Sequence, residues 1–122
     1  MTKFKSQGFN NTFRNARKGF NLAVKSETNI KIHVMVAIIV MGLAIYLHFT
    51  PIEFCILLIA IALVIVTEML NTAIEFALDS IYHNRYSKMV GMAKDISAGA
   101  VLFATVTSIV IGVFLFGGKL IG

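Results

Sequence analysis

The stretch ISAGAVLFATVTSIVIGVFLF, residues 96–116, contains 21 residues in succession without a charged side chain. An α-helix rises about 1.5 Å per residue, so a helix of this length crosses about 30 Å, the thickness of the hydrocarbon core of a bilayer. Two further uncharged runs, 34–46 and 54–66, precede it and are separated by the turn HFTP at 48–51. The sequence therefore predicts an all-α integral membrane protein with three transmembrane helices, over about residues 30–49, 52–80 and 91–117.

The overall composition supports a membrane location. Of the 122 residues, 57% are hydrophobic and 14% are charged, and the mean hydropathy is +0.83. A soluble domain this small has too little interior to hide so many apolar side chains. We therefore predict a single integral-membrane domain over residues 1–122, and, because no small-residue cleavage site follows a short apolar core, no cleaved signal peptide. The net charge of +5 favours anionic lipid or a phosphorylated substrate as partner, and not nucleic acid.

The segment before the first span has the pattern of an amphipathic helix, over about residues 8–27. Arg14, Lys18 and Lys25 fall away from an apolar stripe at helical spacing, which is made up of Phe9, Phe13, Ala16, Phe20, Ala23 and Val24. Such a helix, aromatic on one face and cationic on the other, is typical of the membrane interface. The alternative is an ordinary amphipathic helix packed against protein.

The distribution of lysine and arginine predicts the orientation in the membrane. Seven of the eleven precede the uncharged run 34–46 of the first span: Lys3, Lys5, Arg14, Arg17, Lys18, Lys25 and Lys31. Arg85, Lys88 and Lys94 lie in or just after the segment 81–90, which reads as a polar loop, and Lys119 is near the C-terminus. Because positive residues stay inside, the N-terminus and the 81–95 region are expected to be cytoplasmic, and the turn at Pro51 to face outward. Pro51 also suits the first turn of the second span.

Four polar residues form a column on the second predicted span. Glu68, Asn71, Glu75 and Asp79 are spaced i, i+3, i+7 and i+11, which places their directions within about 80° of one another along about 16 Å of helix. Glu68 would lie well inside the membrane if Asp79 is near the interface, and an intramembrane carboxylate is a candidate functional residue. Two alternatives are ion pairs that fix helix packing, with Lys94 or Arg85 as partners, and a proton or ion pathway.

The chemistry of this column suits phosphoryl transfer. Mg²⁺ binds one or two carboxylates together with substrate phosphates, a buried carboxylate can accept a proton from a hydroxyl, and a lysine such as Lys94 can hold phosphate oxygens. Together these groups predict metal-assisted transfer of a phosphoryl group to an alcohol. Neither a GxxxxGK[ST] nor a GxGxxG motif is present in the sequence.

Several motifs resemble the bacterial integral-membrane diacylglycerol kinase family. They are EMLNTAIE at 68–75, Asp79, AKD at 93–95 followed by AGAV at 98–101, RNARKG at 14–19, and ExNxKIH at 27–33. The IH pair at 32–33 and the NTAIE form resemble the Gram-positive branch, whose members commonly phosphorylate undecaprenol. The resemblance implies a kinase of the bacterial cytoplasmic membrane that transfers phosphate from MgATP to a lipid alcohol, undecaprenol or alternatively diacylglycerol. It also implies a homotrimer of three-span subunits with active sites shared between neighbours.

The resemblance also implies roles for individual residues. Glu68 would be the general base toward the lipid hydroxyl, and we expect Ser97 and Ala98 to contact the lipid. Glu27 and Glu75 would hold Mg²⁺. The residues expected to bind the nucleotide are Arg14, Arg17, Lys18, Gly19, Asn71, Asp79, Lys94 and Asp95.

Two other classes of function remain open from the residues alone. A small oligomeric transporter could use Glu68 as its coupling carboxylate, and a structural adaptor would need no acidic column. Neither accounts for the adjacent Lys94 and Asp95. His33 and His48 are expected to be interfacial side chains and not ligands, and Glu53 has no evident task.

Small residues recur every fourth position along the third span, at Ala100, Ala104, Ser108 and Gly112. Small side chains permit the close van der Waals contact on which helix association in lipid depends. The pattern predicts that this ridge packs against another helix, either in the same chain or in a neighbouring subunit.

Overall fold

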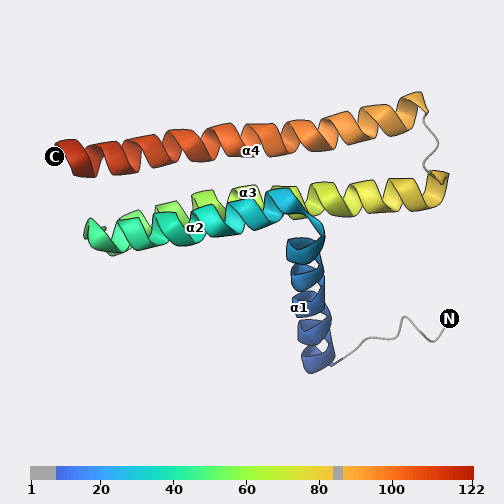
Figure 1. Ribbon diagram of the computed structural model, residues 1–122, viewed down its shortest axis with the longest axis horizontal. Helices are drawn as coiled ribbons and strands as arrows, with labels where there is room; N and C mark the ends of the chain where they lie inside the picture. Colours follow the sequence, from blue (N-terminus) through green and yellow to red (C-terminus); the bar gives the residue numbers. More distant parts are fainter. Residues whose placement is uncertain (1–7, 84–86) are drawn as a thin grey trace.

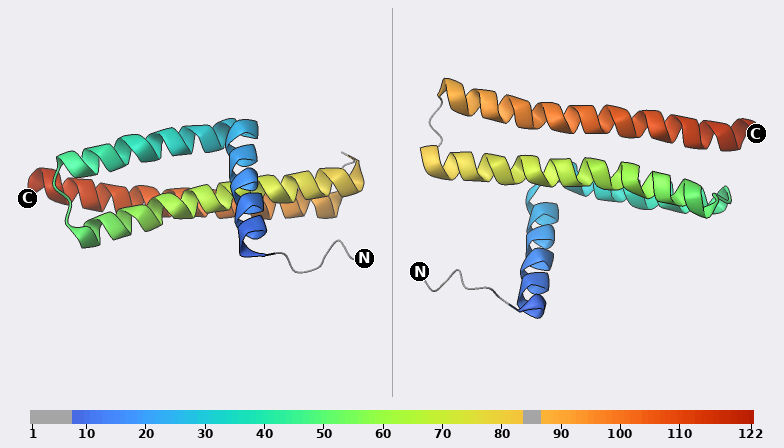
Figure 2. Two further views of the ribbon diagram at one scale, coloured as in Figure 1. Left: turned by 90° about the horizontal axis from the view of Figure 1, so that it is seen from below. Right: turned by 180° about the vertical axis from the view of Figure 1, so that it is seen from behind.

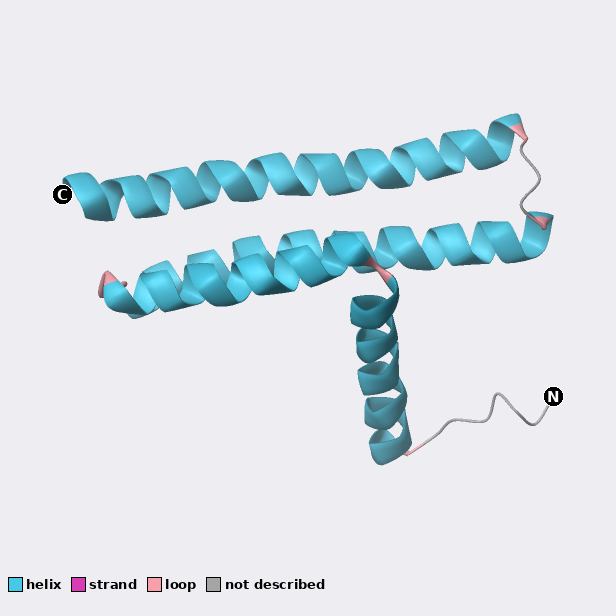
Figure 3. Cartoon of the chain, viewed as in Figure 1, coloured by secondary structure: helices cyan, strands magenta, loops and turns pink. Residues whose placement is uncertain are grey.

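The computed structural model describes residues 8–83 and 87–122, and these form four α-helices. They are α1 (Phe9–Ser26), α2 (Thr28–Tyr46), α3 (Pro51–Tyr82) and α4 (Lys88–Ile121). Within these described ranges only helices and short connections occur (Figure 3). The all-α prediction is confirmed. Lys3, Lys5 and Arg85, which entered the charge argument, lie outside the described residues.

The three long helices run side by side and alternate in direction, with α3 packed against both α2 and α4 (Figures 1 and 2). α1 stands roughly perpendicular to them and joins the bundle part of the way along α3, where α2 begins. α2 has 19 residues, whereas α3 has 32 and α4 has 34. Consequently α3 and α4 continue together beyond the start of α2 as a two-helix extension.

The turn between α2 and α3 is fixed by helix-capping chemistry. The Thr50 hydroxyl accepts a hydrogen bond from the Glu53 backbone N–H at 3.2 Å, and Glu53 Oε1 accepts one from the Thr50 N–H at 2.8 Å. This reciprocal capping box satisfies two amides that the helix leaves unpaired. Pro51 occupies the first helical position, as predicted. His48 has φ of 59°, a left-handed conformation that histidine adopts more readily than bulky residues do.

Glu53 has a second task that the sequence did not reveal. Its Oε1 lies 3.0 Å from Lys119 Nζ, and this ammonium also lies 5.9 Å from the ring centroid of Phe49. The Phe49 ring contacts Phe116 at a centroid distance of 4.9 Å. An ion pair, a cation–π contact and an aromatic pair therefore join the α2–α3 turn to the end of α4.

The other connection is shorter than predicted. The expected polar loop at 81–90 is wrong at both ends, because α3 continues to Tyr82 and α4 begins at Lys88. His83 ends α3 in the left-handed conformation with φ of 51°, and the Ser87 hydroxyl accepts a hydrogen bond from the Val90 N–H at 3.1 Å. These two helix caps shorten the connection to a few residues.

The surfaces of α2, α3 and α4 are those of membrane-spanning helices. All three are long and apolar enough to cross a bilayer. Yet only 11%, 22% and 6% of the residues in the most apolar stretch of α2, α3 and α4, respectively, are buried within the chain. Large side chains such as Ile38, Phe103 and Phe114 are 68%, 77% and 76% exposed. Exposed apolar area on this scale requires lipid or further protein around it. The prediction of three long apolar helices is confirmed, and the protein is a membrane protein.

The small-residue ridge of α4 meets α3 over part of its length. Ala104 is 3% exposed, and the Ser108 hydroxyl donates to the Ala60 carbonyl of α3 at 2.7 Å. Ala100 is exposed. The reason is geometric: residues spaced by four advance about 40° around a helix at each step, so the ridge winds away from α3.

We predict that Ala104→Leu lowers the thermal stability of the detergent-solubilised protein. The three added carbons have no space against α3, and overpacking of this kind typically costs about 1–3 kcal/mol. Val106→Phe is the matched control, because it also adds apolar bulk but at a side chain that is 52% exposed. Thermal melting of both variants checks the prediction, which fails if the two substitutions are equally tolerated.

Candidate active site

The acidic column, Glu68 to Asp79, lies along the C-terminal half of α3. Glu68 and Thr72 are 7% and 5% exposed, although both are polar. Asn71, Glu75 and Asp79 are half-buried. Burying a carboxylate is unfavourable unless it finds a polar or charged partner, so the contacts of these side chains decide what the column can do.

Lys94 contacts the column at its C-terminal end, at Asp79. Its Nζ donates a hydrogen bond to Asp79 Oδ1 at 2.8 Å, which links α4 to α3. Glu75 is also near enough to Lys94 for a favourable charge interaction. Both members of the Lys94–Asp79 pair keep more than a third of their side-chain surface exposed. Asp95 is exposed on a different side of α4, since adjacent helical residues point about 100° apart.

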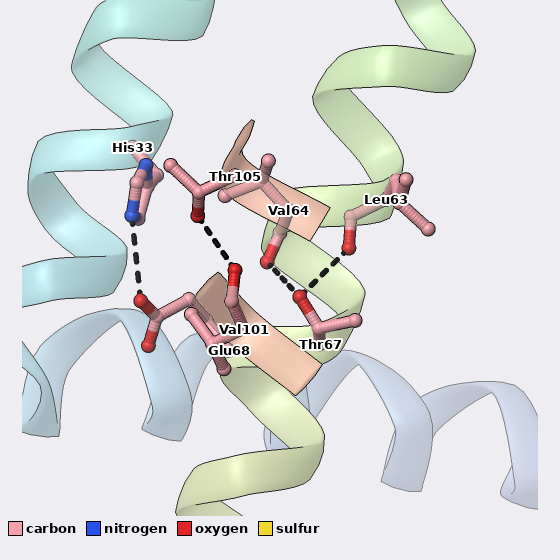
Figure 4. Close-up of polar contacts among 7 residues, drawn as sticks. All are labelled: His33, Leu63, Val64, Thr67, Glu68, Val101 and Thr105. Carbon is pink, nitrogen blue, oxygen red and sulfur yellow. Dashed lines mark hydrogen bonds and ion pairs between the residues drawn. The ribbon is translucent and has the colours of Figure 1, made fainter. Parts of the chain in front are cut away.

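Glu68 has a partner that the sequence analysis missed. His33 Nε2, from α2, lies 3.4 Å from Glu68 Oε1, and the two side chains retain 29% and 10% of their surface exposed. Figure 4 shows the imidazole of α2 directed at the carboxylate of α3. The sequence predicts an interfacial side chain at His33, and nothing in it places α2 beside residue 68. The available signals were that His33 is a polar residue at the start of an apolar run and that it belongs to the ExNxKIH motif at 27–33.

The His33–Glu68 contact also fixes the depth of the column. His33 is five residues into α2, so Glu68 lies about 8 Å along the bundle from the first residue of that helix, Thr28. Asp79 is about 16 Å further along α3, in the two-helix extension. The column therefore begins inside the three-helix part of the molecule and ends outside it.

An apolar groove borders His33. It lies between α2, α3 and α4 and is lined mainly by aliphatic side chains, among them Val36, Val40, Leu57 and Val64. Two hydroxyls also line it, but each donates to a backbone carbonyl: Thr105 to Val101 at 2.8 Å and Ser108 to Ala60 at 2.7 Å (Figure 4 shows the first). The side chain of His33 is thus the polar group that the groove presents next to Glu68.

The remaining predicted residues are distributed over several elements. Glu27 is half-buried at the junction of α1 and α2. Ser97 is 8% exposed and Ala98 is exposed. The α1 residues predicted to bind nucleotide, Arg14, Arg17, Lys18 and Gly19, are all exposed in the single chain.

The carboxylates suit a magnesium ion that is shared with a substrate. Among the described residues no three acidic, histidine or cysteine side chains form a ready-made metal cage. Mg²⁺ does not require one, because it uses one or two carboxylates together with phosphate oxygens and water. Asn71 Oδ1 is buried without a hydrogen-bond donor among the described residues, and such an atom is costly unless another group satisfies it. The donor set therefore fits Mg²⁺ held jointly with a phosphorylated ligand.

Comparison with known proteins identifies the family. Residues 14–116 match the family described as prokaryotic diacylglycerol kinase. The chain is 34% identical over 101 residues to a diacylglycerol kinase of Synechocystis sp., an alignment that covers 83% of this chain and 58% of that protein. It is 32% identical over 112 residues to an undecaprenol kinase of Bacillus subtilis, covering 92% and 90% of the two chains. A diacylglycerol kinase of Haemophilus influenzae is 32% identical over 107 residues, covering 87% and 90%.

These similarities extend over three long apolar helices and the entire acidic column. The family resemblance inferred from the motifs is confirmed, and the transporter and adaptor alternatives lose their support. The column provides the types of group that phosphoryl transfer requires. They are the buried carboxylate of Glu68, the acids Glu75 and Asp79, and the ammonium of Lys94. The chain belongs to the prokaryotic diacylglycerol kinase family, a family of membrane-embedded lipid kinases.

Proposed function

We propose that the protein transfers the γ-phosphate of ATP to the hydroxyl of undecaprenol, giving undecaprenyl phosphate. The observation that carries the kinase chemistry is the burial of Glu68 against His33, a residue that lines an apolar groove, since this places a carboxylate one side chain away from where a long hydrocarbon would lie. Undecaprenol is favoured by the residues Ile32 and His33 at the start of α2, which resemble the Gram-positive branch, and by similarity to the Bacillus subtilis undecaprenol kinase along 90% of its length. Diacylglycerol is the second candidate substrate, because most of the relatives, including those of Synechocystis sp. and Haemophilus influenzae, are named diacylglycerol kinases.

The proposed reaction begins with proton removal at Glu68. Its carboxylate accepts the proton of the lipid hydroxyl while the hydroxyl oxygen forms a bond to the γ-phosphorus. The bond between that phosphorus and the β–γ bridging oxygen breaks, and ADP leaves with the bonding electrons. The burial of Glu68 excludes water, so the lipid hydroxyl is the nucleophile that the base can activate.

Charged side chains near the C-terminal end of the column would position the phosphates of ATP. Lys94, held by Asp79, offers a cation to the phosphate oxygens. Glu27 and Glu75 would hold Mg²⁺, and the bound metal would offset the negative charge of the β- and γ-phosphates. Asn71, Asp95 and the exposed basic residues of α1, Arg14, Arg17 and Lys18, would complete the nucleotide site around the Gly19 backbone.

The geometry of α1 supports a cytoplasmic active site. α1 stands perpendicular to the spans (Figure 1) and carries exposed aromatic side chains, with Phe9 at 81% and Phe13 at 60%. We propose that it lies in the membrane interface. The two-helix extension that carries Asp79 and Lys94 would then project into the cytoplasm, where ATP is found, and Glu68 would remain about 8 Å inside.

We further propose a homotrimer in which neighbouring chains complete each site. In the single chain Lys94 faces Asp79 and Glu75, whereas Asp95 and the basic residues of α1 are exposed. The large apolar side chains left exposed on the spans also offer area for contact between subunits.

The proposed function predicts ATP-dependent phosphorylation of undecaprenol that depends on Glu68. Purified protein in mixed micelles, given labelled ATP with undecaprenol or diacylglycerol, should label undecaprenol with the higher kcat/KM. Glu68→Gln should lower kcat by about 10²–10⁴-fold, because the amide has the size of the acid but is not a base. Binding of the nucleotide, measured by calorimetry, should be retained.

A parent enzyme that labels neither lipid would overturn the proposed function. Preferential labelling of diacylglycerol would overturn only the choice of substrate. Near-normal turnover by Glu68→Gln would exclude this residue as the base.

The metal assignment predicts a changed Mg²⁺ requirement in two variants. Glu27→Ala and Glu75→Ala should each need a much higher Mg²⁺ concentration for half-maximal activity, since each removes one carboxylate ligand. Magnesium titrations at fixed ATP measure the shift. Glu53→Ala, which removes a carboxylate from the opposite end of α3, should titrate like the parent. Overlaid curves for all the proteins would show that Glu27 and Glu75 do not bind the metal.

The shared site predicts rescue between inactive chains. If Glu75 and Asp95 serve different subunits' halves of one site, trimers that mix Glu75→Ala chains with Asp95→Asn chains should recover activity, because some sites then combine two intact halves. Co-expression with two affinity tags isolates the mixed trimers, and trimers of either variant alone provide the controls. Verified mixed trimers without activity would contradict this division.

A further inference from the structure

We infer that His33 is a positioning residue for Glu68, holding one carboxylate oxygen of the base so that the other faces the lipid hydroxyl. This inference rests on the proposed function and adds to it a residue whose role lies outside the acidic column. It starts from the 3.4 Å separation of His33 Nε2 and Glu68 Oε1, from two different helices.

The burial of Glu68 makes this partner important. The side chain is 10% exposed, and His33 is the group that makes a polar contact with it among the described residues. A buried carboxylate without a hydrogen-bond donor is strongly disfavoured. The hydroxyl of the preceding residue, Thr67, instead donates to the Leu63 and Val64 carbonyls at 2.9 Å (Figure 4).

The geometry assigns different tasks to the two carboxylate oxygens. His33 approaches Oε1, which leaves Oε2 free for a hydroxyl. In resting enzymes the hydrogen bonds of catalytic groups are often long and shorten when substrate binds, and a 3.4 Å separation can close in this way. A donor on a separate helix fixes the direction of the carboxylate more firmly than Glu68 could by itself, since a free glutamate side chain has several rotamers.

The groove gives His33 its position relative to the lipid. The imidazole and the aliphatic side chains Val36 and Val64 line the same groove. A lipid alcohol lying in this groove with its hydroxyl at the polar end would meet His33 and Glu68 together. The hydroxyls of Thr105 and Ser108 are not available as donors to the lipid oxygen, because both already donate to backbone carbonyls.

The test is a double-mutant cycle between His33 and Glu68. His33→Leu should lower kcat by about 10- to 100-fold, the range typical for a lost positioning contact, with little change in KM for the lipid. His33→Gln keeps an N–H donor at similar reach and should recover most of the activity. In the Glu68→Gln background, His33→Leu should have almost no further effect, because the residue acts through the carboxylate.

Met35→Leu is the matched control, since it changes apolar bulk on α2 two residues away, at a side chain that is 62% exposed and lies outside the groove, and it should leave kcat unchanged. Equal losses from His33→Leu in both backgrounds would overturn the inference, as would a His33→Gln variant as impaired as His33→Leu. So would a Met35→Leu variant that loses as much activity as His33→Leu. A parent that phosphorylates neither lipid would instead count against the proposed function, which keeps the two failures distinct.

Discussion

A carboxylate inside an apolar helix bundle must be satisfied by a polar partner, and the organisation of this molecule follows from how Glu68 meets that requirement. The partner, His33, comes from α2, so α2 must lie beside the middle of α3 and in one axial register. That register determines where α1 leaves the bundle and how much of α3 and α4 extends beyond it. Thus a single contact between a histidine and a glutamate relates the depth of Glu68 in the bundle to the position of α1.

The two ends of the bundle are held by different interactions. At the end next to the α2–α3 turn Glu53, Lys119 and Phe49 combine charge and aromatic contacts, and near the other end of α3 Lys94 pairs with Asp79. Half-exposed ion pairs of this kind each contribute little to stability, typically below about 1 kcal/mol. Their effect is to fix which residues of α3 and α4 lie opposite each other. Between them the Ser108–Ala60 hydrogen bond and the buried Ala104 maintain close contact.

Local rules of sequence predicted much of this arrangement. The three spans follow from the uncharged runs, Pro51 marks the start of α3, and the column from Glu68 to Asp79 follows from helical periodicity alone. The capping roles of Ser87 and His83 were missed because the surrounding segment is polar and resembles a loop. The partners His33 of Glu68 and Lys119 of Glu53 could not be predicted, because each depends on how two separate helices slide along one another. No single-helix pattern contains that information.

The short length of α2 has a consequence for the lipid around the protein. Its 19 residues cover about 28 Å, almost the full thickness of an average hydrocarbon core. α2 is bounded by α1 on one side and by the turn at Thr50 on the other, so it has no spare turn with which to span a thicker membrane. In a thicker membrane the hydrophobic mismatch would be absorbed by local thinning of the bilayer, by snorkelling of flanking side chains or by association of chains, at a cost of fractions of a kcal/mol per Å. The length of the surrounding acyl chains would thereby affect the junction between α1 and α2, because this junction is one end of the span.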